Sequence, residues 1–322
     1  MAKPPIPTVI AIVGPTSTGK TDLSVRIAKK INGEIISGDS RQVYQGLDIG
    51  TGKVTPREMR GVPHHLVDIV SPRTVYNASA YVRDGRRALR DILQLGKTPI
   101  IVGGTGFYID ALLGRIELAS IEPNQTLRNK LKRLSLRELQ TRLKRVDPKR
   151  YRGIDIKNPR RLIRAIEISV GTPTALPLPL SHIRIIWIGL TLPTDVLKKK
   201  IHFRLIERIR KGMLGEAKQL HRRGVSWKRM HALGLEYRYL ALYLQKKISK
   251  KEMMEQLEKE IVAYAKRQMT WFKKNPKICW FSPQEARQIL DSVGGQSLFL
   301  RTPRLRMATR ARQSRRGKGR SQ

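Results

Sequence analysis

The sequence predicts an α/β protein whose core is a parallel sheet of the P-loop NTPase type, with a helical insertion domain and C-terminal helices. Three observations support this fold class. Apolar, strand-like segments alternate with helical segments over residues 9–112. A glycine-rich phosphate-binding motif directly follows the first apolar segment. A basic, helix-favouring stretch then separates this region from a late apolar strand at residues 183–190, which we expect to return to the main sheet.

The composition points to a polyanionic partner. The chain has 322 residues, and its 65 Lys and Arg residues against 25 Asp and Glu residues give a formal charge of +40. Such a charge is typical of proteins that bind nucleic acid, and less often of proteins that bind membranes. No apolar stretch approaches the roughly 20 residues of a membrane span, and the N-terminus does not resemble a signal peptide. The single cysteine, Cys279, excludes an internal disulfide and is expected to be buried. We therefore expect a cytoplasmic protein that binds no membrane.

The phosphate-binding motif lies between a predicted strand and a predicted helix, which is the structural context that such a motif requires. It follows the apolar run at residues 9–13, precedes a segment with helical periodicity, and reads Gly14, Pro15, Thr16, Ser17, Thr18, Gly19, Lys20, Thr21. Backbone amides in such a loop and the positive end of the helix dipole bind a diphosphate. Lys20 is expected to neutralise the outer oxygens, and the Thr21 hydroxyl is expected to hold Mg²⁺. The alternative is an ordinary glycine-rich turn.

Other residues of the core are expected to meet this loop. Further strands are predicted at residues 34–37, 65–69 and 99–102, and a helix at 78–95 with Asn77 as its N-cap. Ligands of parallel sheets bind at the carboxyl ends of the strands. Asp39 follows the second strand and Thr105 follows the fourth, so both should face the same crevice as the phosphate loop.

The chain is expected to divide at changes of composition. Residues 1–114 form the first part of the core, 115–182 the insertion, 183–295 the return to the core, and 296–322 a basic tail. Residues 128–164 carry fifteen Lys and Arg against three acids, and the loop that follows contains Pro173, Pro177 and Pro179. The tail from residue 301 has nine Arg and Lys and no acid, so we expect it to be disordered.

The helices after the late strand are predicted at residues 194–211, 213–223, 236–246 and 250–274. Ser249 and Glu252 have the spacing of a capping box at the start of the last one. The apolar face predicted for that helix consists of Met254, Leu257, Ile261, Tyr264, Ala265 and Trp271. Tyr264 and Trp271 are therefore expected to be core residues.

Several segments together resemble the tRNA dimethylallyltransferase family, the bacterial type of tRNA isopentenyltransferase. Besides the phosphate loop, these are Ile36-Ser-Gly-Asp-Ser-Arg-Gln-Val-Tyr44, Gly46-Leu-Asp-Ile-Gly-Thr-Gly-Lys53, Pro63-His-His-Leu-Val-Asp68, Gly103-Gly-Thr-Gly-Phe-Tyr108, Asn158-Pro-Arg-Arg-Leu-Ile-Arg-Ala-Ile-Glu167 and Ala265-Lys-Arg-Gln-Met-Thr-Trp-Phe272. The segments follow the order of the family, and the resemblance covers about residues 8–282. It implies a P-loop fold and the transfer of a dimethylallyl group from dimethylallyl diphosphate to N6 of adenosine 37 in tRNA.

The chemistry implied by this resemblance suits the residues. Diphosphate is the leaving group, so Lys20, Mg²⁺ at Thr21 and the loop amides would stabilise the charge that develops on it. An exocyclic amine needs a proton acceptor, and Asp39 is the best candidate. Thr105 matches a family hydroxyl that would position the diphosphate and the amine. Arg204 matches a diphosphate-contacting arginine more loosely. The alternatives are a turn cap or a water-mediated Mg²⁺ ligand for Asp39, turn geometry for Thr105, and a solvated side chain for Arg204.

The resemblance also implies a tRNA-binding surface. A base in the anticodon loop must be extruded to reach a buried site, and its neighbours must be held. The residues implied for these contacts are Asp39, Ser40, Arg41 and Gln42 near the extruded adenine, and Arg160, Arg161, Leu162, Ile163, Arg164, Lys266, Arg267 and Gln268 on the flanking backbone. Taken alone, each basic cluster is more often a solvated helix face.

The sequence differs from the family pattern at two points, and it leaves three alternative functions open. The chain has Gly234-Leu-Glu-Tyr-Arg238 where the family commonly has Gly-Tyr-Lys-Glu, and it lacks the zinc-finger extension of some eukaryotic relatives. His64 and His65 are expected to enter a strand and not to bind metal. The rivals are an ATP-dependent small-molecule kinase, an enzyme that prenylates free adenine nucleotides, and a non-catalytic RNA-binding protein. We expect a monomer.

Overall fold

The computed structural model describes residues 6–119, 121–172 and 183–286. By the contacts between its residues, the chain divides into a core unit, Met1–Arg115 with Leu180–Gln322, and a second unit, Ile116–Pro179. The basic tail and the proline-containing loop at residues 173–182 lie outside the described residues.

The core unit is built on a six-stranded sheet in which every strand pairs in parallel. The strand order is β3-β2-β4-β1-β5-β6, with β1 Thr8–Val13, β2 Gly33–Ser37, β3 His64–His65, β4 Thr98–Gly103, β5 Arg184–Leu190 and β6 Cys279–Phe281. The late strand β5 pairs directly with β1 along its length. The predicted fold class, a P-loop-like parallel sheet, is thus confirmed.

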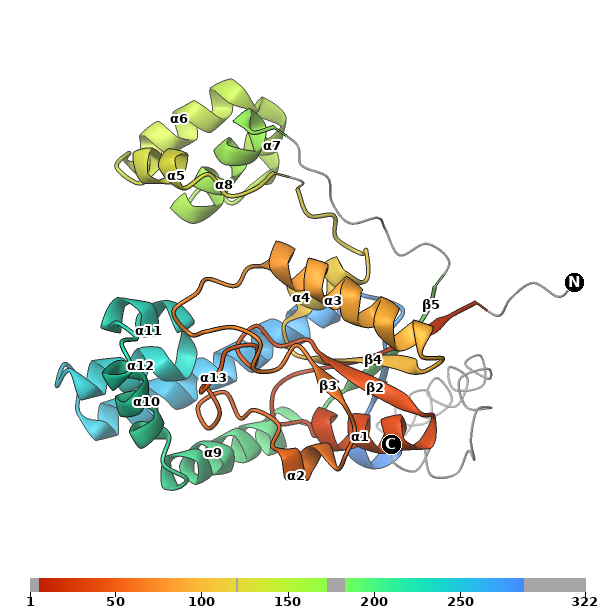
Figure 1. Cartoon of the computed structure of the whole chain (residues 1–322). Coiled ribbons are helices and arrows are strands. Elements are labelled where there is room, and N and C mark those ends of the chain that lie inside the picture. The colour runs from red at the N-terminus through yellow and green to blue at the C-terminus, as the bar shows by residue number, and fades with distance from the viewer. Residues whose placement is uncertain (1–5, 120, 173–182, 287–322) are drawn as a thin grey trace, which may run out of the picture. The chain divides into compact units, whose positions relative to one another are not determined.

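Helices cover the sheet because its strands are apolar on both faces, as parallel strands usually are. The helices of the first part are α1 Lys20–Lys30, α2 Pro56–Met59, α3 Ala78–Gln94 and α4 Gly106–Leu112. In Figure 1, α1 lies on one face of the sheet and α3 on the other. Asn77 caps α3 as predicted, since its side chain accepts a hydrogen bond from the Ala80 amide.

The remaining helices of the core follow β5. They are α9 Thr194–Arg210, α10 Met213–Arg222, α11 Trp227–Leu233, α12 Leu235–Leu244 and α13 Lys250–Phe272. Ser249 and Glu252 form the predicted capping box at the start of α13. No described helix combines the length and the apolar character that crossing a bilayer requires.

Three details of the core differ from the sequence-based expectations. The third strand ends at His65, because Leu66 and Asp68 adopt left-handed backbone angles (φ 61° and 56°) that break a strand. The helix α11 and the edge strand β6 were not predicted, and Cys279 is only half-buried in β6. The buried face of α13 is turned from the predicted one and consists of Met253, Leu257, Ile261, Ala265, Gln268 and Phe272.

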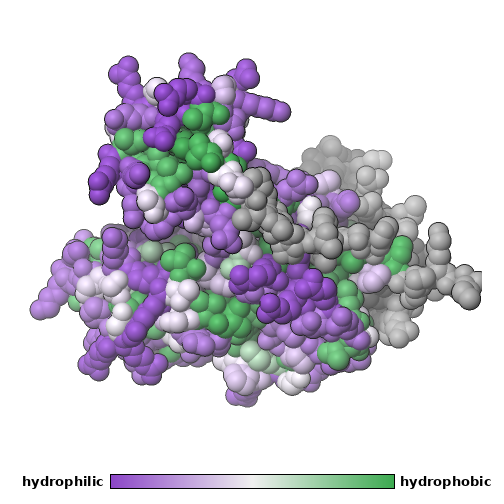
Figure 2. Space-filling view, turned by 45° about the horizontal axis from the view of Figure 1, so that its top comes forward, coloured by the Kyte–Doolittle hydropathy of each residue, from purple (hydrophilic) through white to green (hydrophobic). Residues whose placement is uncertain are grey.

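The second unit is a small bundle of four helices with its own apolar core. These helices are α5 Gln125–Leu131, α6 Leu136–Val146, α7 Pro148–Gly153 and α8 Pro159–Val170. Leu162 and Ile163, which the family resemblance implied as tRNA contacts, are buried in this core together with Leu139 and Leu143. The surface of the unit seen in Figure 2 is largely hydrophilic, with an apolar strip between the charged side chains.

A buried carboxylate ties the bundle together. Glu167 is 1% exposed, and its two oxygens accept hydrogen bonds from the Asn124 amide (2.6 Å), from the Arg128 guanidinium (two bonds of 2.9 Å) and from Arg164 (2.5 Å). Arg164 also donates to the Ile121 carbonyl at 2.7 Å. Burial would raise the pKa of Glu167, but the donors around it bring the pKa below its usual value. Arg164 is therefore engaged inside the unit.

Glu167→Gln should destabilise this bundle selectively. The substitution leaves Arg128 and Arg164 without their shared anion, at a cost of about 2 kcal/mol because both arginines keep partial access to water. Hydrogen exchange of the full chain in urea should show earlier opening of residues 121–170 and unchanged opening of α3. The exposed Glu122→Gln is the control. Equal opening of the two variants would contradict the assigned role of Glu167.

Candidate active site

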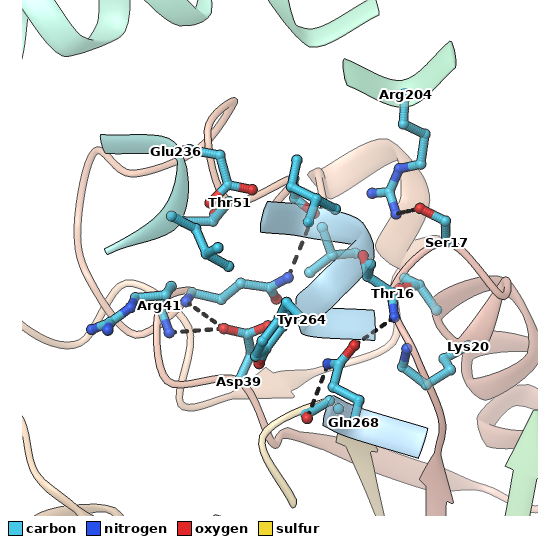
Figure 3. A pocket seen from close by; sticks show the side chains of 18 of the residues that line it. Thr16, Ser17, Lys20, Asp39, Arg41, Thr51, Arg204, Glu236, Tyr264 and Gln268 are labelled. Atoms are coloured by element: carbon cyan, nitrogen blue, oxygen red, sulfur yellow. Dashed lines mark hydrogen bonds between the residues drawn. The ribbon is translucent and has the colours of Figure 1, made fainter. Parts of the chain in front are cut away.

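A cleft of about 750 Å³ opens at the carboxyl ends of the central strands, within the core unit. It is lined by residues of the phosphate loop, the segment after β2, the turn after β4, and helices α9 and α13. Parallel sheets bind ligands at this edge, so the position is the one expected from topology. Thr16, Ser17, Lys20, Asp39, Arg204 and Tyr264 line the cleft, as Figure 3 shows.

The phosphate loop has a backbone that requires glycine at its first position. Gly14 has φ 137°, and a Cβ there would lie 2.3 Å from the Leu190 carbonyl oxygen on the neighbouring strand β5. At the other end, Gly19 has φ 85° and precedes the first turn of α1. The loop therefore delivers its backbone and the N-terminus of α1 to the cleft, which is the arrangement that binds anions.

Lys20 lies in a half-buried and electropositive position. Its Nζ donates to the carbonyl of Pro15 at 2.7 Å, within its own loop. Burial lowers the pKa of Lys20 to about 7, and the positive charge of Arg204 acts in the same direction while Asp39 opposes it. Arg204 reaches the loop from α9 and donates to the Ser17 hydroxyl at 3.4 Å. Two cations are thus directed to the place where a diphosphate would lie.

Asp39 lines the same cleft, and Thr105 contacts the residue that follows Asp39. Asp39 accepts hydrogen bonds from the amides of Arg41 (2.8 Å) and Gln42 (3.4 Å), which fixes its carboxylate at the start of a turn. The Thr105 hydroxyl accepts the amide of Ser40 at 3.1 Å and so joins the two loops. The residues predicted as base and hydroxyl partner from separate segments are therefore neighbours in space.

Sequence reasoning placed Tyr264 in the core, and the structure corrects this. Tyr264 points from α13 into the cleft and lies beside Asp39 (Figure 3). Burial raises its pKa to about 12, and the Asp39 carboxylate adds to the rise. Helical spacing alone could not reveal this, because a cleft-facing aromatic residue and a core residue have the same period.

Two more residues of the cleft were missed. Glu236 on α12 accepts a hydrogen bond from Arg208 on α9 at 3.0 Å, and Arg208 also donates to the Gly50 carbonyl at 2.8 Å. Burial raises the pKa of Glu236 above its usual value, although the charge of Arg208 opposes this. Glu236 lies in the segment where the chain departs from the family pattern, which was the only signal in the sequence.

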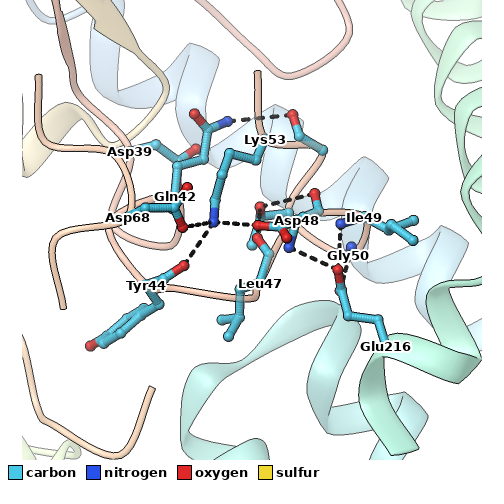
Figure 4. A network of polar contacts seen from close by, with 12 residues as sticks. Asp39, Gln42, Tyr44, Leu47, Asp48, Ile49, Gly50, Lys53, Asp68 and Glu216 are labelled. Atoms are coloured by element: carbon cyan, nitrogen blue, oxygen red, sulfur yellow. Dashed lines mark hydrogen bonds and ion pairs between the residues drawn. The ribbon is translucent and has the colours of Figure 1, made fainter. Parts of the chain in front are cut away.

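A polar network holds the loop that closes one wall of the cleft (Figure 4). Glu216 accepts the amides of Asp48 (2.8 Å), Ile49 (2.6 Å) and Gly50 (2.9 Å). Lys53 donates to the Tyr44 carbonyl at 2.8 Å and pairs with Asp48 at 2.5 Å and with Asp68. The segment of residues 46–53 is thus fixed by charge-assisted bonds, and it presents Thr51 and Gly52 to the cleft.

The residues implied for tRNA binding divide into two groups. Arg160, Arg161, Lys266 and Arg267 are exposed, and Ser40, Arg41 and Gln42 are half-buried at the cleft. Leu162, Ile163 and Gln268 are buried, and Arg164 is bonded to Glu167 and to a backbone carbonyl. The first group is available to a partner, whereas the second contributes to the internal structure of its unit.

Thr21 is exposed at the start of α1 and lines the cleft, as a hydroxyl ligand of Mg²⁺ beside a diphosphate should. In the described parts of the chain, no group of three or more His, Cys, Asp or Glu side chains is arranged to hold a metal ion. Mg²⁺ commonly keeps several waters and takes one or two protein ligands with substrate phosphates. The described residues therefore fit a Mg²⁺ ion only as the source of a single hydroxyl ligand, Thr21.

Fold and cleft together define a P-loop-like α/β protein whose cleft brings a phosphate-loop motif together with a carboxylate. Comparison with known proteins identifies the family within this class of proteins. A family model described as IPP transferase matches residues 42–275, and one described as isopentenyl transferase matches residues 7–75. The chain therefore belongs to the IPP transferase family.

Individual relatives agree with this assignment. The tRNA dimethylallyltransferase 2 of Treponema denticola is 42% identical over 83% of this chain and 92% of its own length. The crystal structure of the tRNA isopentenylpyrophosphate transferase of Bacillus halodurans matches this chain with a TM-score of 0.67 and 35% sequence identity. The match covers 95% of the Bacillus halodurans chain. A eukaryotic dimethylallyltransferase acting on tRNA, 24% identical with a TM-score of 0.73, shares the fold.

Proposed function

We propose that the chain transfers a dimethylallyl group from dimethylallyl diphosphate to N6 of adenosine 37 in tRNA and releases diphosphate. The observation that carries this proposal is a cleft in which a phosphate loop with two cations lies beside Asp39, while the Thr105 hydroxyl accepts the amide of the next residue, Ser40. Family membership and the charge of +40 support tRNA as the acceptor.

In the proposed reaction the adenine N6 attacks C1 of the dimethylallyl group while the bond from C1 to the diphosphate oxygen breaks. Lys20, Arg204 and the loop amides hold the leaving diphosphate, and Asp39 takes the proton that N6 loses. Mg²⁺ bound with the diphosphate at Thr21 would supply further charge stabilisation. The adenine must be extruded from the anticodon loop to reach Asp39, near Arg41 and Gln42 at the mouth of the cleft.

The proposal is tested by incubating unmodified tRNA with the protein, dimethylallyl diphosphate and Mg²⁺, followed by mass spectrometry of the nucleosides. A prenylated adenosine should appear without ATP. An absolute ATP requirement would support a kinase, and prenylation of free AMP in place of tRNA would support the nucleotide-prenylating alternative. The monomeric state and the cytoplasmic location stay predictions from the sequence.

The exposed arginines of the second unit should contribute part of the salt dependence of tRNA binding. If Arg160 and Arg161 each hold one phosphate, Arg160→Gln with Arg161→Gln should flatten the slope of log affinity against log salt by about 1.5 units. Affinity for dimethylallyl diphosphate should not change. Arg164 is left intact because it supports Glu167.

The control for this variant is Lys29→Gln with Arg90→Gln, which removes the same charge from exposed positions on α1 and α3. Filter binding over a range of salt concentrations measures both variants. An equal change of slope in the two would show that the arginines act only through the net charge of the protein.

A further inference from the structure

Gln268 occupies a position that differs from that of the basic residues before it in the sequence. Lys266 and Arg267 are exposed on α13, whereas Gln268 is 6% exposed and points toward the sheet. Figure 3 shows its amide between the phosphate loop and the turn after β4. Gln268 lines the cleft, but its small exposed fraction and its two bonds to the loops leave little of the side chain for an RNA backbone.

The amide of Gln268 satisfies one backbone group on each of the two loops. Its Oε1 accepts the amide hydrogen of Thr16 at 2.9 Å, and its Nε2 donates to the carbonyl of Gly104 at 3.0 Å. Only a side chain with an acceptor and a donor at one end can do both. Gly104 permits this approach, because a Cβ at that position would lie 2.0 Å from Nε2.

The two bonded groups belong to the two halves of the cleft. Thr16 begins the part of the phosphate loop that leads to Ser17 and Lys20. Gly104 precedes Thr105, whose hydroxyl accepts the Ser40 amide next to Asp39. One planar amide therefore connects the side of the cleft that would hold the leaving diphosphate with the side that would hold the acceptor.

We propose that Gln268 is a positioning residue that fixes the distance between the phosphate loop and the Thr105 turn, and that it makes no contact with RNA. This inference rests on the proposed prenyl transfer for its catalytic meaning. A transfer reaction depends on the separation of nucleophile and leaving group, and fixed donors are effective because they need no rearrangement during the reaction. The Thr16 amide is already bonded, so the loop is held in place before a diphosphate arrives.

Hydrogen exchange measured on the full chain tests the inference without any activity assay. Gln268→Leu removes both bonds at similar volume and should raise exchange at the Thr16 amide and in residues 103–106 by about tenfold, the effect of one lost hydrogen bond. Gln268→Glu keeps the acceptor and loses the donor. At pH 8 it should raise exchange in residues 103–106 while the Thr16 amide stays protected. If either variant exchanges its amide hydrogens at the wild-type rate in both loops, the proposal is overturned.

Kinetics separate positioning from a merely structural role. With the folded fraction measured by thermal melting, Gln268→Leu should lower kcat by about tenfold to a hundredfold, and tRNA affinity should stay within about twofold. The matched control, Lys266→Gln with Arg267→Gln, should weaken tRNA binding and leave both loops protected. A loss of tRNA affinity in Gln268→Leu with unchanged kcat and unchanged loops would show a direct RNA contact and overturn the proposal. If the wild-type protein transfers no prenyl group, the proposed function fails, and the exchange experiment still decides whether Gln268 holds the two loops.

Discussion

Asp39→Asn is expected to slow prenyl transfer by about 10²–10⁴-fold while tRNA binding largely survives. The asparagine side chain retains an oxygen that can accept the amides of Arg41 and Gln42, so the turn at the mouth of the cleft should keep its shape. What is lost is the capacity to take a proton from the adenine N6. The effect should therefore appear in the rate constant of prenyl transfer measured under single-turnover conditions.

Two comparisons make this result specific to Asp39. Asp195→Asn, an exposed change of the same chemistry on α9, should leave kcat unchanged. Near-normal turnover of Asp39→Asn would contradict the assignment of the base. Glu236, a half-buried carboxylate that also lines the cleft, would then be the next candidate, although its ion pair with Arg208 occupies one of its oxygens.

The parts of the fold and of the site that the sequence could predict are those that local patterns determine. A phosphate loop between an apolar strand and a helix has one usual structure, and the capping residues Asn77 and Ser249 act on amides three residues away. Asp39 and Thr105 could be brought together from the sequence because parallel strands place their carboxyl ends on one edge. No distant contact had to be known for these predictions.

The parts that could not be predicted depend on contacts between distant segments. Gln268 and Thr16 are separated by 252 positions, and their hydrogen bond leaves no periodic trace in the sequence. The family resemblance implied Gln268 as a tRNA contact together with Lys266 and Arg267, but a helix turns by 100° per residue and thus places neighbours on different faces. Tyr264 was expected in the core for another reason, because a cleft-facing residue and a core residue of a helix have the same period.

Lys20→Ala should weaken the binding of dimethylallyl diphosphate by about tenfold to a hundredfold, the effect of one charge-assisted hydrogen bond. The wild-type affinity should also depend on pH in a defined direction. Without ligand the pKa of Lys20 is about 7, because partial burial and the charge of Arg204 lower it. A bound diphosphate adds negative charge and raises this pKa, so binding takes up a proton when Lys20 is neutral.

The affinity should therefore be highest below pH 7 and should fall as the pH rises above 7, toward tenfold per unit until the pKa of the complex is reached. Lys20→Arg provides the control, because a guanidinium stays charged over this range and should abolish the part of the pH dependence that comes from residue 20. The ionisation of the ligand itself affects both proteins equally and cancels in the comparison. Calorimetry in buffers of different ionisation enthalpy measures the proton uptake directly. Identical pH profiles for wild type and Lys20→Arg would show that Lys20 is already charged in the free cleft, and that the nearby Asp39 carboxylate outweighs burial and the repulsion from Arg204.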